Sequence, residues 1–189
     1  RLESLLPVKS GAGDPESSKD VNIVLVLDIS QSTGGAFIQG EQVTKVDVMK
    51  ALAHSIIDSV KKEDKLAVVA FNTQGYLVSA LTPLSSKPEI KDNIAKLRAG
   101  GGTDITQGIL MADQLLRNAK GSKNIILISD GITMDPSSTL RQVAVTNTGG
   151  VKVYSVGVRF DTFEFLMNEI ARFGKGIYFQ PTQAEKLKI

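Results

Sequence analysis

The chain contains no cysteine and no tryptophan, and it has a single histidine, His54, among its 189 residues. Without cysteine, this sequence can form no disulfide bond and can offer no thiolate as a nucleophile or as a zinc ligand. One histidine cannot build a histidine-rich metal cluster, and the apolar period around His54 predicts an ordinary residue on a helix face. Thiolate and histidine chemistry are therefore poor explanations of this sequence.

Long apolar runs and an excess of one charge are also missing. No run approaches the roughly 18 residues that cross a bilayer, so we expect no direct membrane insertion by this fragment. The 22 basic and 20 acidic residues give a net charge of +2, and no basic block is interleaved with aromatic residues, so we expect no nucleic-acid partner. The length allows one substantial domain, which we expect to be monomeric in isolation.

The chain divides into three parts by composition. Residues 1–20 are polar, rich in small residues and without a hydrophobic period, which predicts a linker or the end of a preceding region. Residues 21–181 carry the pattern of one domain, and residues 182–189 are interpreted as the start of a following segment. Because the sequence begins at Arg1 without a leader pattern, we expect it to be a piece of a longer protein.

Strand-like and helix-like stretches alternate from Asn22 onward. The strand-like runs are continuously apolar, as in strands covered on both faces, whereas the helix-like stretches repeat apolar residues every three or four positions. Strands are predicted at 23–27, 66–71, 76–81, 124–129, 151–158 and 176–179. Helices are predicted at 46–60, 88–97, 105–118, 137–146 and 163–173, with Gly174 ending the last one. This order predicts an α/β fold with a doubly wound, Rossmann-like, mostly parallel six-stranded sheet and helices on both faces.

Three stretches place oxygen-bearing side chains at the ends of these elements. Asp28, Ser30 and Ser32 follow the first strand, Thr103 precedes a helix, and Asp130 follows a strand. The helix 105–118 is about 21 Å long and the strand 124–129 about 20 Å, so the chain returns to the same edge of the sheet. If the strands beginning at 23 and 124 are neighbours, all three stretches meet at the edge where such sheets bind ligands.

Each stretch alone also has a local explanation, and these alternatives stay open. Asp28 fits a turn after a strand, Asp104 with Gln107 fits a capping box, and Asp130-Gly131 is a common turn pair. Together, however, the stretches supply two carboxylates and three hydroxyls, which are the all-oxygen ligands that Mg²⁺ prefers. We therefore predict a divalent-metal site, with its ligands at the surface and outside the core.

At these positions the sequence resembles the von Willebrand factor type A domain and its metal-ion-dependent adhesion site. That site has the pattern Asp-x-Ser-x-Ser, a threonine after glycines, and Asp-Gly after a strand. The matching residues are Asp28, Ser30, Ser32, Thr103 and Asp130. The resemblance covers roughly residues 21–181 and implies one antiparallel edge strand, the short third strand. It also implies bound Mg²⁺ (or Mn²⁺ or Ca²⁺) and a protein partner that offers an Asp or Glu carboxylate.

Two features depart from the family pattern. Gln31 stands where a small residue is common, and the segment 33–41 is longer than the short prokaryotic form, so we expect it to shape partner choice or to cover part of the site. Arg159, in another predicted rim loop, is interpreted either as steering an acidic peptide or as an ordinary solvated arginine. "LESLLPV" and "LRAGGGTDI" resemble bacterial and archaeal membrane proteins that join this module to a glutamine-amidotransferase-like domain, which implies a membrane-anchored parent.

Three functional hypotheses follow, led by a metal-dependent protein-binding module. The first alternative is a phosphoryl-transfer or hydrolytic enzyme on the same type of sheet, and the second is a structural scaffold with a vestigial site. Haloacid-dehalogenase-type enzymes need an aspartate where Ser30 stands, and neither a phosphate-binding nor a dinucleotide-binding glycine loop is present. Because a nucleophilic Ser30 or Ser32 would also lack an obvious base, we expect no enzymatic activity.

Overall fold

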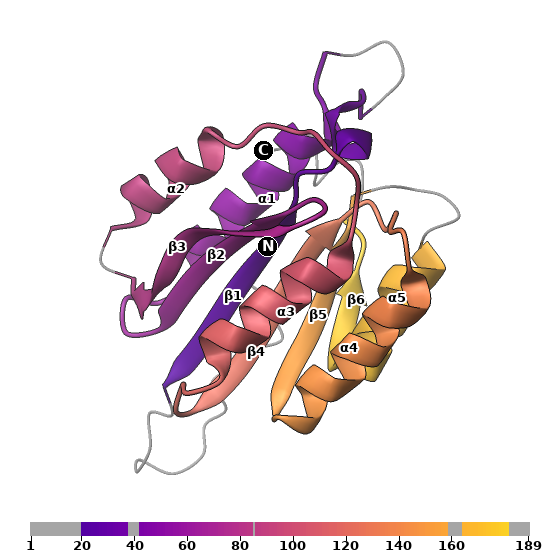
Figure 1. The fold of residues 1–189 in the computed structure, drawn as a ribbon. Helices are drawn as coiled ribbons and strands as arrows, with labels where there is room; N and C mark the ends of the chain where they lie inside the picture. The colour runs from indigo at the N-terminus through magenta and orange to yellow at the C-terminus, as the bar shows by residue number, and fades with distance from the viewer. Residues whose placement is uncertain (1–19, 38–41, 85, 159–163, 182–189) are drawn as a thin grey trace.

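The computed structural model describes residues 20–37, 42–84, 86–158 and 164–181, which form a six-stranded sheet between two layers of helices (Figure 1). The strands are β1 Val21–Asp28, β2 Lys65–Phe71, β3 Gly75–Pro83, β4 Ser122–Ser129, β5 Val151–Gly157 and β6 Lys175–Phe179. The helices are α1 Lys45–Ser59, α2 Lys87–Ala95, α3 Ile105–Leu116, α4 Pro136–Thr148 and α5 Glu164–Phe173, with a short 3₁₀ helix, η2, at Gln31–Gly34. The predicted fold class is confirmed. The predicted linker up to residue 19 and the segment 182–189 lie outside the described residues.

The order of the strands brings the predicted site together. The sheet runs β3-β2-β1-β4-β5-β6, and every neighbouring pair is parallel except β2 and β3. β1 pairs directly with β4, with Leu25 opposite Ile126. The chain leaves β1 toward one side of the sheet and later returns to its other side through β4, which makes the β1/β4 boundary a topological switch point. The carboxyl ends of β1 and β4 are therefore adjacent.

The third strand differs from its prediction in length. We predicted a short strand at 76–81, whereas β3 spans nine residues, Gly75–Pro83, and is antiparallel to β2 as predicted. β3 is an edge strand, so its outer side needs no ladder hydrogen bond and a proline can end it. Pro83 pairs opposite Lys65 at the far end of β2. A rule that excludes proline from strands therefore predicts too early an end for β3.

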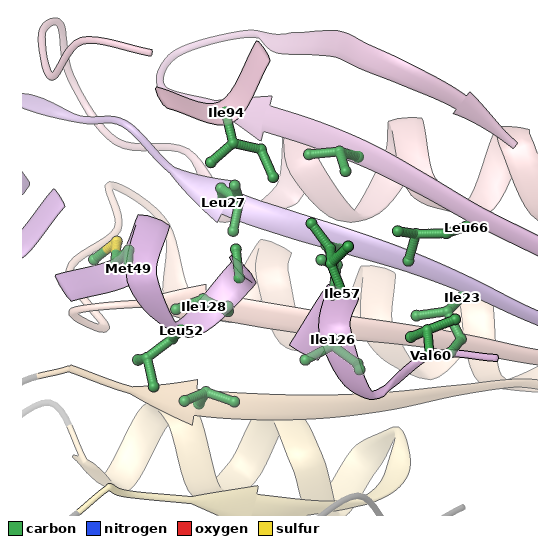
Figure 2. Close-up of a cluster of buried hydrophobic side chains, with 14 of the residues drawn as sticks. Ile23, Leu27, Met49, Leu52, Ile57, Val60, Leu66, Ile94, Ile126 and Ile128 are labelled. Carbon is green, nitrogen blue, oxygen red and sulfur yellow. The ribbon is translucent and has the colours of Figure 1, made fainter. Parts of the chain in front are cut away.

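Apolar side chains cover both faces of the sheet. Ile23, Leu25 and Leu27 of β1 join α1 and α2 in one cluster, shown in part in Figure 2. Val24 and Val26 point to the other face and join α3, α4 and α5 in a second cluster. Because both faces of β1 are buried, its sequence is a continuous apolar run with no polar alternation. His54 of α1 lies 3.2 Å from the Lys91 carbonyl through Nε2, in line with its predicted place on a helix face.

Gly174 follows α5 directly, as predicted for the residue that ends this helix. The left-handed conformation belongs to the next residue, Lys175, with a φ of 52°. Gly174 is needed for space instead, because a Cβ there would lie 2.4 Å from the Val153 Cβ. No helix within the described ranges has both the length and the apolar character needed to traverse a bilayer.

Candidate metal centre

Asp28 ends β1 at the switch point with its carboxylate fully enclosed. Its Oδ1 accepts a hydrogen bond from the Ser30 backbone N–H at 2.9 Å, and its Oδ2 accepts one from Ser129 Oγ at 2.7 Å. Burial raises the pKa of Asp28 to about 6, while these hydrogen bonds partly oppose the rise and the Asp130 charge adds to it. The expectation that the ligands lie at the surface was wrong for this residue, which is 0% exposed.

Ser30 and Ser32 turn toward the same point. Their Oγ atoms are 3.1 Å apart, and Ser30 is buried while Ser32 is half-buried. The turn is held by Thr33, whose Oγ1 donates to the Ser30 carbonyl at 2.7 Å within η2. Gln31 between the serines is exposed to solvent, so it does not enter the site. The alternating Asp-x-Ser-x-Ser spacing thus gathers its hydroxyls as predicted.

The glycine loop before α3 is bound directly to the first cluster. The Gly100 N–H donates to the Ile29 carbonyl at 2.8 Å, and the Gln31 N–H donates to the Gly101 carbonyl at 2.9 Å. Gly101 has a φ of 81°, a left-handed conformation that favours glycine. Asn72 holds this loop from the other side, because its Nδ2 donates to the Gly100 carbonyl at 3.1 Å. These bonds carry the chain to Thr103, which is 7% exposed.

Asp130 completes the edge after β4. The Thr103 carbonyl accepts a hydrogen bond from the Met134 N–H at 2.9 Å, which ties the third stretch to the second. The Asp130 Oδ1 accepts from the Ile132 N–H at 3.2 Å, and Oδ2 accepts from Lys45 Nζ at 3.1 Å. Gly131 has a φ of 81°, so the local turn explanation for Asp130-Gly131 holds together with the convergence.

Asp104 has the local role that its sequence context allowed. Its Oδ1 accepts from the Thr106 N–H at 3.0 Å and so caps α3. Gln107 Nε2 donates to Asp104 Oδ2 at 3.1 Å, so Gln107 contacts the cap's side chain rather than its backbone. Neither bond of the predicted capping box is therefore formed, but Asp104 still serves the helix as a simple N-cap.

Two residues that contact the candidate ligands were not predicted from the sequence. Ser129 donates to Asp28, and its Oγ also accepts from the Gly131 N–H at 3.0 Å. Lys45 donates to Asp130 and to the Ser32 carbonyl, both at 3.1 Å. Ser129 had a weak signal, as a polar residue ending an apolar strand. Lys45 also had a weak signal. A cation in the first turn of a helix is unfavourable beside the positive end of the helix dipole, so its presence there indicates another contact.

The donor set fits a hard divalent cation. Two carboxylates and the hydroxyls of Ser30 and Ser32 come to one edge, and the glycine loop brings Thr103 to the same edge; these are oxygen ligands of the type that Mg²⁺ accepts. Within the described ranges, no three acidic, histidine or cysteine side chains group closely enough to hold an ion by themselves. The hydroxyls are therefore essential to the set, which is Asp28, Ser30, Ser32, Thr103 and Asp130.

The long segment after Ser32 is partly described. Ala36 pairs with Thr44 in an isolated antiparallel bridge, and the Phe37 N–H donates to the Val43 carbonyl at 2.8 Å. This segment therefore folds back on itself just before α1. Its residues 38–41 lie outside the described part of the chain, as does Arg159, so the predictions made for them stay predictions.

Comparison with known proteins supports the resemblance. The model of the von Willebrand factor type A domain matches residues 22–188. The chain is similar to inter-alpha-trypsin inhibitor heavy chain H2 of Mesocricetus auratus, at 31% identity over 194 residues, covering 88% of this chain and 19% of that protein. The chain spans only 19–29% of the length of the first sequence relatives that it matches.

Solved structures share the fold at low sequence identity. An aerotolerance-related membrane protein from Bacteroides fragilis superposes with a TM-score of 0.75 at 20% identity, covering 89% of this chain and 100% of that one. Mussel proximal thread matrix protein 1, whose metal-ion-dependent adhesion site is occupied by zinc, superposes with a TM-score of 0.69 at 18% identity, covering 87% of this chain and 44% of that one. The predicted pairing with a glutamine-amidotransferase-like domain stays a prediction.

Proposed function

The chain belongs to the von Willebrand factor type A domain family, and on this premise we propose that it is a divalent-metal-dependent protein-binding module. The observation that carries the proposal is that three separate stretches bring two carboxylate-bearing and three hydroxyl-bearing residues to the switch point of the sheet. We propose Asp28, Ser30, Ser32, Thr103 and Asp130 as the residues that hold the ion. Mg²⁺ is the expected ion, with Mn²⁺ and Ca²⁺ as alternatives for the same oxygen ligands.

The hydroxyl ligands favour an anionic partner. Bound to neutral hydroxyls, the ion would keep more of its positive charge than in a cage of carboxylates and would attract an incoming Asp or Glu. This domain's own residues supply only two carboxylates, Asp28 and Asp130, and the other proposed ligands are neutral hydroxyls, so fewer negative charges surround the ion than in a cage of carboxylates. We therefore propose a partner that contributes a carboxylate.

A groove beside the site suits the chain that flanks such a carboxylate. Its volume is about 540 Å³, and it lies between the start of β3 and the end of α2, with Ile29 at the end nearest to Asp28. Lys96 and Arg98 line it, no acidic residue does, and Leu77 beside them is 52% exposed. This lining is complementary to a peptide that carries acidic and apolar side chains.

The enzymatic alternative finds little support in the contacts of the serines. Ser30 Oγ lies against Ser32 Oγ, and the only histidine of the sequence bonds to α2 instead. Lys45, the cation at the site, contacts the Ser32 carbonyl and not a serine hydroxyl. Asp28, the carboxylate whose side chain hydrogen-bonds to Ser30, is proposed here as a ligand of the ion and not as a catalytic base.

Calorimetric titration with MnCl₂ and MgCl₂ tests the metal site. Asp28→Asn should weaken binding at least about 100-fold, because it removes a charged ligand in the site without removing volume. Asp104→Asn is the matched control: it removes a carboxylate at the same edge, and asparagine also caps helices well. Equal affinity of wild type and Asp28→Asn would contradict the site.

Retention of a partner tests the binding function itself. The immobilised domain should capture a partner from a lysate of its source organism with Mg²⁺ and release it with EDTA, and Thr103→Ala and Arg98→Glu should each capture less. Replacing the acidic residues of that partner one at a time should identify a single carboxylate on which capture depends. A partner held equally with EDTA and by Thr103→Ala would exclude the metal-bridged mode.

A further inference from the structure

Among the described residues, the ion pair of Lys45 is the one in which both side chains are least exposed. Lys45 Nζ lies 3.1 Å from Asp130 Oδ2, with 14% of the lysine side chain and none of the aspartate side chain exposed. In the pairs Lys65–Asp20 and Lys91–Asp58, the acidic side chain is more than half exposed. The Coulomb attraction between two charges is less screened away from water than at the surface, and removing one partner of a shielded pair is costly. The Lys45 ammonium is therefore a fixed charge and not a loosely held surface lysine.

The helix that carries Lys45 does not explain its position. Lys45 is the first residue of α1, where the partial positive charge of the helix end disfavours a cation. The capping box of Thr44 and Asp47 already satisfies this helix end, and the Lys45 N–H donates to the Gly35 carbonyl at 3.1 Å. The ammonium is directed instead to Asp130 and to the Ser32 carbonyl, which belong to two of the three stretches of the candidate metal centre.

We propose that Lys45 is a resident cation of the metal centre that competes with the divalent ion for Asp130. This inference rests on the proposed function, because it presupposes an ion held by the five oxygen ligands. An ammonium in contact with Asp130 Oδ2 reduces the attraction of that carboxylate for a second cation and repels the ion itself. Lys45 thereby lowers the metal affinity of the free domain.

The count of formal charges connects this competition to partner binding. The carboxylates of Asp28 and Asp130 contribute −2, and a divalent ion brings the centre to zero. With Lys45 in place, the loaded centre carries +1, which one partner carboxylate neutralises. Lys45 therefore weakens metal binding by the free domain and strengthens the attraction of the loaded domain for an acidic partner, so that metal and partner bind cooperatively.

Titration of Lys45→Met with MnCl₂ tests the first half of the proposal. Methionine keeps most of the lysine stem and removes the charge, so the variant should bind Mn²⁺ about tenfold more tightly than the wild type. Lys45→Arg keeps the charge and should stay within about twofold of the wild type. Lys50→Met is the matched control, because Lys50 lies on the same helix but donates to the Ala95 carbonyl, away from the centre.

Acetate serves as the carboxylate probe for the second half. With Mn²⁺ saturating, acetate binding is followed through the water-proton relaxation caused by Mn²⁺. Lys45→Met should need several-fold more acetate for half of the change in relaxation than wild type and Lys50→Met need.

Thermal unfolding in EDTA completes the comparison. Lys45→Met should unfold earlier there, because Asp130 has lost its counter-ion, and should gain more from added Mn²⁺ than the wild type does.

The possible results separate this inference from the proposed function. If Lys45 only braces Asp130, Lys45→Met will bind Mn²⁺ as the wild type does or more weakly, which overturns the inference and leaves the metal site standing. An unchanged acetate response would overturn the proposed coupling to the partner. If neither the wild type nor Lys45→Met binds Mn²⁺, the inference falls together with the proposed function.

Discussion

β1 and β4 carry buried polar side chains at both ends, and the two ends differ in chemistry. At the amino end, Asn22 Nδ2 donates to the carbonyls of Lys120 and Ser122 at 2.7 and 2.9 Å, and Asn124 Nδ2 donates to the Asn22 carbonyl at 3.2 Å. These neutral amides bond to backbone carbonyls at the edge of the sheet. Asn22 Oδ1 is a buried acceptor without a hydrogen-bond partner, but among the described residues no charged side chain is buried at this end.

At the carboxyl end the buried polar groups are charged. Asp28 and Asp130 are 0% and 2% exposed, and Lys45 is the cation paired there with one of them. A buried carboxylate destabilises the folded chain unless a cation compensates it. Burial of polar groups therefore does not by itself indicate a ligand site, whereas buried charge in excess of its counter-ions does.

Placing a carboxylate at the amino end should have the largest effect. Asn22→Asp removes the two donor hydrogen bonds and sets a negative charge against two carbonyl oxygens. We expect a loss of about 3–5 kcal/mol in the free energy of unfolding at pH 7, measured by urea denaturation, because the charge is buried and the lysines opposite Asn22, Lys65 and Lys123, bond to Asp20 and to the Arg117 carbonyl instead. Asn22→Ala is the control and should lose about 1–3 kcal/mol. If Asn22→Asp loses no more than Asn22→Ala, the two ends do not differ in the way described.

Removing the charge at the carboxyl end should change the pH dependence of stability. Asp28 has a pKa of about 6 in the folded chain against 3.8 ordinarily, so the folded state holds its proton more tightly than the unfolded state. Its contribution to stability is fully present below pH 3.8 and is lost as the pH rises through 6. At about 1.4 kcal/mol per pKa unit the whole loss is about 3 kcal/mol, of which about 2 kcal/mol falls between pH 4 and pH 8.

Urea denaturation of wild type and Asp28→Asn in EDTA, at pH values from 4 to 8, measures this effect. The variant has no titrating group at position 28, so the difference in stability between the two proteins should shift in its favour as the pH rises. A difference that is constant with pH would mean that Asp28 has an ordinary pKa and that its burial has no electrostatic cost.

The smallest expected effect concerns Ser129, which orients Asp28. Ser129→Ala removes the 2.7 Å hydrogen bond to Asp28 Oδ2 and should lower Mn²⁺ affinity about tenfold, the usual effect of losing a residue that positions a metal ligand. Ser155→Ala is the matched control: Ser155 is a buried serine on neighbouring β5 and donates to the Met167 carbonyl at 2.6 Å. Both variants should lose stability, but only Ser129→Ala should lose metal affinity.

The periodicity of the sequence was sufficient to predict most of the fold. β1 and β4 were predicted because a continuous apolar run has few alternatives to a strand covered on both faces. The prediction of the third strand failed because its place at the edge of the sheet overrode a local sequence rule. Pro83 ends a long edge strand because no outer neighbour needs its missing N–H.

The sequence by itself determined the chemistry available to this protein. The absence of cysteine and the single histidine leave oxygen ligands, and Asp28, Ser30 and Ser32 meet because they lie on one short loop. Only the tertiary structure decided how deeply Asp28 is buried and that Lys45 pairs with Asp130. Those contacts join residues 85 and 101 positions apart, through the pairing of β1 with β4 and the docking of α1 beside them. Electrostatic energy depends on distance and burial in space, and neither can be read from the order of residues along the chain.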